Sequence, residues 1–541
     1  MTIDPRAGTL VETENVLEVS KLIQAFFHRK PDISVIAQRV KFGTSGHRGS
    51  AFDTTFNEDH ILAITQAICR YRASQGIDGP LFLGRDTHAL SQPAFQVALE
   101  VLAANGVTIM IDDHDGYTPT PVISHAILNY NRSRTTGLAD GIVITPSHNP
   151  PQDGGFKYNP PHGGPAESGI TSWIENTANG FLKTGLTDVR RLGAAKGHAP
   201  QIVPHDYVNS YVSSLDAVVE MQAIRSAGLR IGIDPLGGAA VHYWEPVAEK
   251  FGLNITVTDT TVDPTFRSIP RDWDGNIRMD CSSPYPMKRL LAQKDAYDVA
   301  FANDTDSDRH GIVSKAGLMP PNDYLAVCAS YLGRERPAFK GRKIGKTVVS
   351  SSMIDRVAED LSTALFEVPV GFKWFVEGLH AGGIYFCGEE SAGSSFLRRD
   401  GSVWTTDKDG LIAGLLAAEI TARSGKTPDI LFDELTSRLG KTFYARLDNP
   451  ANESLRSKLS KAEPADILAT ELGGDVVREK FSKAPGNNAS IGGIKLSTAN
   501  GWVAARPSGT EDVYKIYAES FVSTEHLARL QADTAKILRE L

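Results

Sequence analysis

The chain has 541 residues, more than a single hydrophobic core can hold, because such cores stop growing near about 250–300 residues and longer chains divide into domains. Hydrophobic residues make up 41% of the sequence and charged residues 22%, a composition that fits a globular protein and excludes a disordered or fibrous one. The net charge of −8 argues against a broad surface for nucleic acid or membrane, although a few clustered Arg and Lys could still bind a small anion.

Short apolar runs alternate with segments of helical periodicity, which is typical of α/β domains. One helix is predicted to follow Asn57, and a second to begin at Ser91, a candidate N-cap, and to stop at Gly106. Each predicted strand runs into a loop rich in Gly, Asp, Ser or Pro, and open α/β sheets bind ligands at such strand ends. The strands are predicted at residues 81–83, 142–144, 231–233, 299–302 and 384–387.

Three breaks divide the sequence. Residues 183–205 are rich in Gly, Ala and Pro and are predicted to be a linker, and further breaks fall at 317–322 and 425–442. Near the C-terminus, residues 502–505 and 514–519 flank a tight loop and predict a half-exposed hairpin. We therefore expect an N-terminal extension and four domains, at residues 1–39, 40–205, 206–320, 321–440 and 441–541.

Cellular location is predicted from what the sequence lacks. The four cysteines lie far apart and form no CxxC pair, which indicates reduced thiols rather than disulfides or a zinc site. The first residues show no basic segment followed by an apolar one, so we expect no secretory signal. The longest apolar stretch, near residues 411–420, is about half the length that spans a bilayer. A cytoplasmic protein is expected.

The first motif with chemical potential is the loop 145–150, Thr-Pro-Ser-His-Asn-Pro, which follows a predicted strand and carries Ser147 at its tip. Two prolines stiffen this loop. A serine hydroxyl is a weak nucleophile unless a neighbouring group activates it or it already carries a phosphoryl group. Ser147 is therefore either a reactive serine or a turn serine whose hydroxyl bonds only the backbone.

The second motif is the acidic loop 303–309, which follows the predicted strand 299–302. Its carboxylates occupy every second position, at Asp304, Asp306 and Asp308, and such a spacing lets them converge on one hard cation. Mg²⁺ binds few protein carboxylates and keeps positions for water or phosphate oxygens, so it fits better than Ca²⁺. The alternative is a solvated acidic loop.

Three other loops offer polar groups. Residues 506–510, Arg-Pro-Ser-Gly-Thr, could bind phosphate, although a plain hairpin turn is the alternative. Residues 388–393 carry adjacent acids and a hydroxyl, which suit sugar hydroxyls. Residues 43–49 form a glycine-rich loop with an arginine, and Lys157 could transfer a proton. Together, the loops predict one site in a cleft between four domains.

In this order the loops resemble the α-D-phosphohexomutase superfamily, and in particular its bacterial phosphoglucomutase branch. The resemblance covers the chain from Val40 to the C-terminus. It implies an α/β fold of four domains around a central cleft, with three related α/β domains of mixed sheets and a smaller α+β C-terminal domain. The stretches that carry it are residues 41–49, 141–160, 302–317, 371–378, 387–410 and 506–520.

The resemblance also assigns roles to single residues. Ser147 matches the phosphoserine, and Asp304, Asp306 and Asp308 match the Mg²⁺ ligands, with the serine phosphate completing the shell. Lys157 and Lys408 match basic residues proposed for proton transfer, and Arg48 supports the serine loop. The substrate-binding matches are Arg309, Lys373 in the loop that senses sugar orientation, Glu389 and Ser391 for sugar hydroxyls, and Arg506, Ser508, Gly509 and Thr510 for the distal phosphate.

The implied reaction interconverts glucose 1-phosphate and glucose 6-phosphate through a phosphoserine enzyme and glucose 1,6-bisphosphate, which also serves as activator. Gly393 stands where the phosphomannomutase branch has histidine, which favours glucose over mannose but leaves the second acid/base group open. The alternatives are phosphomannomutase or phosphoglucosamine mutase activity, a metal-dependent phosphatase, and a non-catalytic phosphosugar-binding homologue. Sugar phosphates are the expected partners, with no nucleic acid or membrane, and the chain is expected to be a monomer or homodimer.

Overall fold

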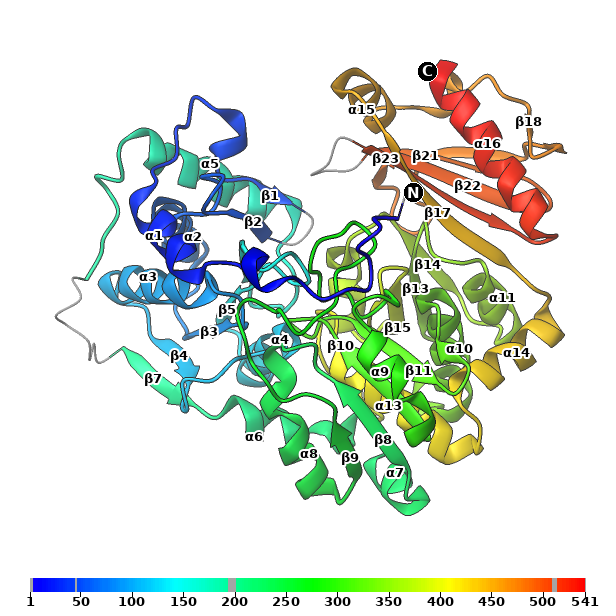
Figure 1. Ribbon diagram of the computed structural model, residues 1–541, viewed down its shortest axis with the longest axis horizontal. Helices are drawn as coiled ribbons and strands as arrows, with labels where there is room; N and C mark the ends of the chain where they lie inside the picture. Colours follow the sequence, from blue (N-terminus) through cyan, green and yellow to red (C-terminus); the bar gives the residue numbers. More distant parts are fainter. Residues whose placement is uncertain (1–2, 44–45, 193–200, 508–512, 541) are drawn as a thin grey trace. The chain divides into compact units, whose positions relative to one another are not determined.

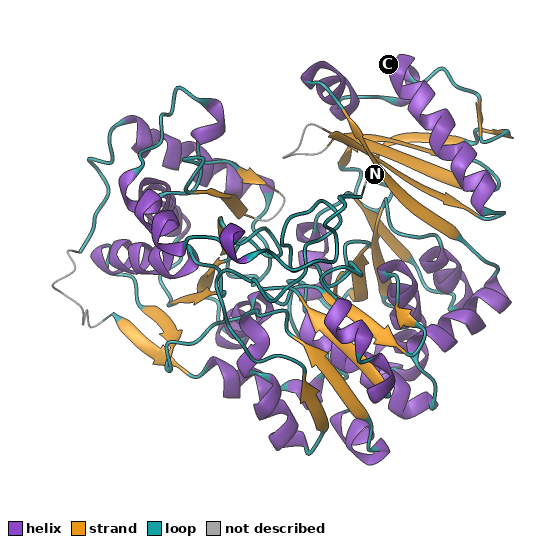
Figure 2. Cartoon of the chain, viewed as in Figure 1, coloured by secondary structure: helices purple, strands orange, loops and turns teal. Residues whose placement is uncertain are grey.

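The computed structural model describes residues 3–43, 46–192, 201–507 and 513–540. These residues form two compact units, which we describe separately. The larger unit comprises residues 3–318 and 397–425, and the smaller unit comprises residues 319–396 and 426–541. Within both units, sheets are flanked by helices, as Figure 2 shows.

The larger unit begins with a mixed seven-stranded sheet in the order β1-β2-β6-β5-β3-β4-β7. Strands β5, β3, β4 and β7 are parallel, whereas β5, β6, β2 and β1 pair antiparallel in turn. The central strands are buried along their whole length, as expected for parallel strands that are covered on both faces. The strands are β1 (Phe42–Gly43), β2 (Gly46–Ser50), β3 (Leu81–Arg85), β4 (Ile109–Asp112), β5 (Asp140–Ile144), β6 (Asp153–Asn159) and β7 (Ile202–His205).

Strand β7 corrects the prediction that residues 183–205 are only a linker. Ile202–His205 pairs in parallel with β4 at the edge of the sheet, although residues 193–200 lie outside the described part. An edge strand buries little apolar surface, so its short sequence shows no strong periodicity. Tertiary pairing, rather than local pattern, makes this segment a strand.

The second sheet of the larger unit has five strands in the order β12-β11-β10-β8-β9. Strands β10, β8 and β9 are parallel, and β11 returns antiparallel beside β10. The acidic loop 304–309 therefore connects two adjacent, fully buried strands. The strands are β8 (Arg230–Asp234), β9 (Asn254–Val257), β10 (Val299–Asn303), β11 (His310–Ser314) and β12 (Gly317–Leu318).

Ten α-helices surround these two sheets in the described part of the larger unit. The helix predicted after Asn57 is confirmed, since Asn57 is the N-cap of α2. Helix α1 buries Leu22 and Phe26 in the core of the first sheet, so the N-terminal extension is an integral part of this unit. The helices are α1 (Val19–His28), α2 (Glu58–Gln75), α3 (Ser91–Ala104), α4 (Thr120–Asn131), α5 (Ser168–Lys183), α6 (Tyr207–Val212), α7 (Met221–Ala227), α8 (Trp244–Phe251), α9 (Lys288–Ala292) and α13 (Gly410–Ser424).

The smaller unit contains a third α/β sheet in the order β14-β13-β15-β16. Strands β14, β13 and β15 are parallel and β16 is antiparallel. Helix α14 corrects the prediction of a bare break at 425–442, because Pro428–Leu439 packs on α10. The elements are β13 (Lys343–Thr347), β14 (Leu365–Val368), β15 (Ile384–Glu389), β16 (Gly393–Phe396), α10 (Pro321–Glu335), α11 (Met353–Asp360), α12 (Val376–His380) and α14 (Pro428–Leu439).

The C-terminal part of the smaller unit is a five-stranded antiparallel sheet in the order β17-β23-β22-β21-β20. Helix α16 lies across one face of this sheet, where Ile516 and Leu530 are fully buried (Figure 1). The predicted hairpin is confirmed as the pair β22–β23. The elements are β17 (Phe443–Pro450), β20 (Glu479–Lys483), β21 (Ser490–Ser497), β22 (Gly501–Pro507), β23 (Val513–Ser520), α15 (Glu453–Ser460) and α16 (Thr524–Glu540), with a small ribbon of β18 (Glu471–Leu472) and β19 (Asp475–Val476).

Three α/β sheets with mixed strand directions and a fourth, antiparallel sheet with helices confirm the predicted fold class. The described residues contain no helix that is both long and apolar enough to cross a lipid bilayer.

Arg72 of α2 and Asp140, the first residue of β5, form a buried ion pair, and we expect this pair to be important for stability. The Arg72 Nε atom lies 2.9 Å from Asp140 Oδ2, and Tyr158 also donates a hydrogen bond to this carboxylate. Replacing Arg72 with Met leaves a buried charge without its partner, which typically costs about 3–5 kcal/mol. Urea unfolding should show this loss. Arg70→Met breaks an exposed ion pair with Asp188 and a cation–π contact with Phe181, and should cost only about 1–2 kcal/mol.

Candidate active site

The serine loop, residues 145–150, follows the buried strand β5 and packs closely against strand β6. Ser147 is 1% exposed and has a φ of 59°, a left-handed backbone conformation that non-glycine residues rarely adopt. Gly155 permits the close packing, because a Cβ atom at this position would lie 2.1 Å from the Thr145 carbonyl oxygen. The loop is therefore tightly confined and presents the Ser147 hydroxyl in a fixed direction.

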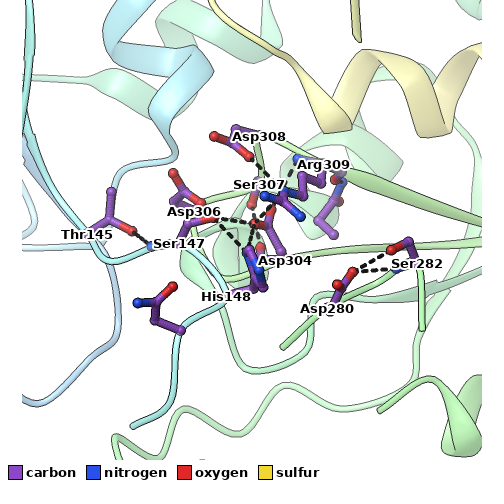
Figure 3. A network of polar contacts seen from close by, with 12 residues as sticks. Thr145, Ser147, His148, Asp280, Ser282, Asp304, Asp306, Ser307, Asp308 and Arg309 are labelled. Carbon is purple, nitrogen blue, oxygen red and sulfur yellow. Dashed lines mark hydrogen bonds and ion pairs between the residues drawn. The ribbon is translucent and has the colours of Figure 1, made fainter. Parts of the chain in front are cut away.

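The acidic loop brings its three carboxylates together between β10 and β11. One oxygen from each of Asp304, Asp306 and Asp308 lies within 4.8 Å of the others, and all three residues are buried. Ser307 also has a left-handed backbone, with a φ of 59°, and its N–H donates to the Asp304 carbonyl oxygen. The turn at Ser307 directs the alternating carboxylates to one side, as Figure 3 shows.

The two loops meet although 157 residues separate them in the sequence. The Ser147 hydroxyl donates a hydrogen bond of 2.8 Å to Asp304 Oδ2, and His148 Nδ1 lies 3.3 Å from the same hydroxyl (Figure 3). A phosphoryl group on Ser147 would thus stand beside the carboxylate cluster. Such a concentration of negative charge requires positive partners.

Two lysines supply positive charge to the carboxylates. Lys157, on β6, places Nζ 2.5 Å from Asp306 Oδ2 and 3.3 Å from Asp308 Oδ2. Lys408 places Nζ 2.9 Å from the same oxygen of Asp308. The loop of Lys408 is held in place because the Gly410 N–H donates to the Ser307 carbonyl oxygen. Lys157 and Lys408 therefore converge on one carboxylate from different parts of the chain.

The pKa values of the carboxylates diverge because their neighbours differ. Burial and the nearby Asp306 and Asp308 raise the pKa of Asp304 well above its ordinary value. Burial alone would also raise the pKa of Asp308, but Lys408 and Lys157 lower it below its ordinary value. Burial raises the pKa of Asp407, beside Lys408, to about 6.

The donor set fits a hard cation such as Mg²⁺. Within the described part of the chain, Asp306 Oδ1 and Asp308 Oδ1 are buried without a hydrogen-bond partner. Buried carboxylate oxygens without partners are rare and costly, and oxygen donors of this kind are the usual ligands of Mg²⁺. With Asp304 oriented towards Ser147, the cluster could share a cation with a phosphoserine oxygen.

Two arginines border the centre. Arg48, on β2, donates a hydrogen bond of 3.1 Å to Asn149 Oδ1 and so contacts the serine loop. The Arg309 Nε atom lies 3.8 Å from Asp308 Oδ1 and 4.0 Å from Asp304 Oδ2. Burial would lower the pKa of Arg309, but Asp280 and the cluster raise it, so Arg309 remains a guanidinium.

The remaining predicted residues lie in the smaller unit. Glu389 ends β15 and accepts a hydrogen bond of 2.8 Å from the Gly371 N–H, which joins the predicted sugar loop to the loop of Lys373. Ser391 follows in the same loop and is partly exposed. Arg506 is the penultimate residue of β22. Ser508, Gly509 and Thr510 lie outside the described residues, as do Thr44 and Ser45 of the glycine-rich loop.

The sequence analysis missed two residues that lie beside predicted site residues. Thr120 donates its hydroxyl to Asp306 Oδ2 at 2.5 Å and its N–H to the Asp306 carbonyl oxygen. Lys515 stands directly opposite Arg506 in the β22–β23 register. Asp448 of β17 stands opposite Lys515 on its other side, so an acidic residue lies in the same row as the two cations. The hairpin pattern around Lys515 could have revealed it, but nothing local distinguishes Thr120.

Comparisons with known proteins agree with this geometry. The chain matches the phosphoglucomutase/phosphomannomutase family descriptions for alpha/beta/alpha domains I, II and III and for the C-terminal domain, at residues 39–182, 209–317, 320–439 and 459–537. It is 57% identical to a phosphoglucomutase of Komagataeibacter xylinus, over 100% of this chain and 98% of the relative.

Solved structures are similar in fold at low sequence identity. A Paramecium phosphoglucomutase, parafusin, matches with a TM-score of 0.72 and 20% identity, over 95% of each chain. A putative phosphomannomutase of Thermus thermophilus matches with a TM-score of 0.71 and 23% identity, over 92% of this chain and 99% of the other. These two likenesses support the arrangement of sheets and helices within the domains.

Proposed function

Because the chain belongs to the phosphoglucomutase/phosphomannomutase family, we propose that it interconverts glucose 1-phosphate and glucose 6-phosphate through a phosphorylated Ser147. The observation that carries this proposal is the contact of 2.8 Å between the Ser147 hydroxyl and Asp304. It joins a buried, conformationally fixed serine to a carboxylate cluster with two lysines. The full-length similarity to a phosphoglucomutase at 57% identity supports the choice of glucose.

In the proposed reaction, the bond between Ser147 Oγ and phosphorus breaks as the 6-hydroxyl oxygen of glucose 1-phosphate bonds to the same phosphorus. The hydroxyl proton leaves the sugar, and Ser147 Oγ takes up a proton. Lys157 and Lys408 are the candidates for these proton transfers, because their amino groups form ion pairs with Asp306 and Asp308 and so stand in the carboxylate cluster beside Ser147. The glucose 1,6-bisphosphate then reverses in the site, and its other phosphoryl group returns to Ser147.

Asp304, Asp306 and Asp308 are the residues that would hold Mg²⁺, together with an oxygen of the phosphorylated Ser147. Bound there, Mg²⁺ would offset the charge on the phosphoryl oxygens during transfer. Arg309 and Lys157 would add positive charge around the same oxygens, and Arg48 would hold the serine loop. Positioning and electrostatics supply most of the acceleration in such transfers.

A coupled assay tests the proposal directly. Enzyme with Mg²⁺ and a trace of glucose 1,6-bisphosphate should form glucose 6-phosphate from glucose 1-phosphate faster than mannose 6-phosphate from mannose 1-phosphate. Faster turnover of mannose 1-phosphate would favour a phosphomannomutase, and release of inorganic phosphate alone would favour a phosphatase. Binding without turnover and without phosphoserine would indicate a sugar-phosphate sensor.

Arg506 is proposed to bind the phosphate that does not react. Replacing it with Ala should raise the KM for glucose 1-phosphate, because a charge-assisted hydrogen bond contributes about 1.5–3 kcal/mol, or roughly 10–150-fold. Steady-state kinetics should show a smaller change in kcat. Arg478→Ala removes an exposed arginine from the same sheet region and is the matched control, with unchanged KM. An unchanged KM in Arg506→Ala would remove this residue from the substrate site.

A further inference from the structure

A buried network contacts the serine loop from the end of strand β3, and its residues Asp86 and His88 belong to none of the predicted motifs. Asp86 follows β3, is 1% exposed, and donates its N–H to the Ile144 carbonyl oxygen at the end of β5. Its carboxylate accepts four hydrogen bonds, at 2.6–3.0 Å. The donors are the His88 N–H, His88 Nδ1, the Ser91 hydroxyl and the Thr145 hydroxyl.

The bond from Thr145 links this carboxylate to the reactive serine. The Thr145 hydroxyl donates its one proton to Asp86 Oδ2 at 2.6 Å and accepts the Ser147 N–H at 2.9 Å. A hydroxyl has one proton and two lone pairs, so the carboxylate fixes its rotation and leaves a lone pair for Ser147. Asp86 thus orients Thr145, and Thr145 holds the backbone of Ser147.

His88 extends the network to the other side of the serine. Its Nδ1 lies 2.8 Å from Asp86 Oδ2, and its Nε2 lies 3.0 Å from the Asn149 carbonyl oxygen. A carboxylate and a carbonyl can only accept, so both ring nitrogens must donate and the ring carries a positive charge. The charged ring then pairs with Asp86 and anchors the loop two residues after Ser147.

The neighbouring Thr87 connects the same strand end to the acidic loop. The Thr87 hydroxyl donates to the Gly237 carbonyl oxygen at 2.8 Å, and two residues later the Ala239 N–H donates to the Thr305 carbonyl oxygen at 2.7 Å. Residues 86–88 therefore contact the serine loop directly and the acidic loop through one intervening turn.

We propose that Asp86 is a positioning residue for Ser147. Through Thr145 and His88 it fixes the backbone on both sides of the reactive serine, in the left-handed conformation that directs the hydroxyl to Asp304. This inference rests on the proposed function of Ser147. Misplacement of a reacting group by about 1 Å can cost roughly 10²-fold in rate, so the network should affect phosphoryl transfer rather than substrate affinity.

Thr145→Val tests this role, because it removes the hydroxyl and keeps the shape of the side chain. We expect kcat to fall about 10–100-fold, with KM within about threefold. The rate at which glucose 1,6-bisphosphate phosphorylates the dephosphorylated enzyme, followed by intact mass, should fall in parallel. Thr145→Ser restores the hydroxyl and should recover most of both rates.

Two further variants separate positioning from stability. Thr421→Val removes another buried threonine hydroxyl, in α13, and should leave kcat unchanged even where it lowers the unfolding temperature. Asp86→Asn replaces one accepting oxygen with a donor, and, where it folds, should lower kcat at least as far as Thr145→Val.

A folded Thr145→Val enzyme with wild-type kcat and phosphorylation rate would overturn the proposal. Loss of rate that Thr145→Ser does not recover would also overturn it. A wild-type enzyme that forms no phosphoserine would instead refute the proposed function.

Discussion

Replacing Ser147 with alanine will abolish phosphorylation of the enzyme by glucose 1,6-bisphosphate and lower kcat by roughly four or more orders of magnitude. The reason is that the proposed reaction passes through a bond between phosphorus and Ser147 Oγ. In the described part of the larger unit, the hydroxyl that bonds the Asp304 carboxylate is that of Ser147, at 2.8 Å. Intact mass measurement shows whether a phosphoryl group is added, and a coupled assay measures kcat.

Ser307→Ala is the matched control for this experiment. Ser307 is also buried, also has a φ of 59°, and lies in the same network (Figure 3). Both substitutions therefore place alanine in the same backbone conformation and remove one buried hydroxyl. The Ser307→Ala enzyme should still be phosphorylated on Ser147 by glucose 1,6-bisphosphate. Phosphorylation of the Ser147→Ala enzyme, located on another residue by peptide mapping, would show that Ser147 is not the carrier.

The sequence predicts the strands of this fold well where they are buried. Residues 142–144 and 299–302 are continuous apolar runs because β5 and β10 are covered on both faces. The edge strand β7 was missed because its pairing with β4, rather than local periodicity, stabilises it. Helix α14 does carry local signals, with Pro428 in its first turn, leucines four residues apart and Gly440 at its end, and the predicted break overlooked them. Chain order and strand ends were enough to predict where the polar loops lie.

The helix start at Ser91 shows where local rules fail. Ser91 was predicted to cap α3, but the helix already includes Ser91, and its hydroxyl donates to Asp86 instead of accepting an N–H of the first turn. A capping pattern therefore concealed part of the support for the serine loop. Propensity identifies the residue type at a helix end, whereas the carboxylate of Asp86, five positions earlier, determines how the Ser91 hydroxyl is used.

The candidate site shows the same limit. Loop-tip residues and the family resemblance predicted that Ser147 and the three aspartates meet at one site, but not the contacts that Lys157 and Thr120 make with Asp306. Lys157 reaches Asp306 across 149 positions, and Thr120 reaches it across 186. Such contacts arise from the packing of the first and second sheets of the larger unit. The roles of Glu389 and Arg506 in the smaller unit stay predictions.

Removing Mg²⁺, or one of its three proposed carboxylate ligands, should stop the reaction. Treatment with a chelator should abolish turnover, and added Mg²⁺ should restore it. Asp306→Asn should weaken Mg²⁺ binding by at least about 100-fold, because changes even to the groups that support metal ligands cost about 10–100-fold. Isothermal titration calorimetry measures this affinity without reference to activity.

Asp280→Asn is the control for the loss of one negative charge. Asp280 lies beside Arg309 and binds Ser282, but it is not one of the three clustered carboxylates (Figure 3). It should therefore keep Mg²⁺ affinity close to that of the wild type. If both variants lost affinity equally, the cation would be held by the general negative charge of the region rather than by the cluster. If Asp306→Asn bound Mg²⁺ as tightly as the wild type, the buried Oδ1 atoms of Asp306 and Asp308 would need another partner.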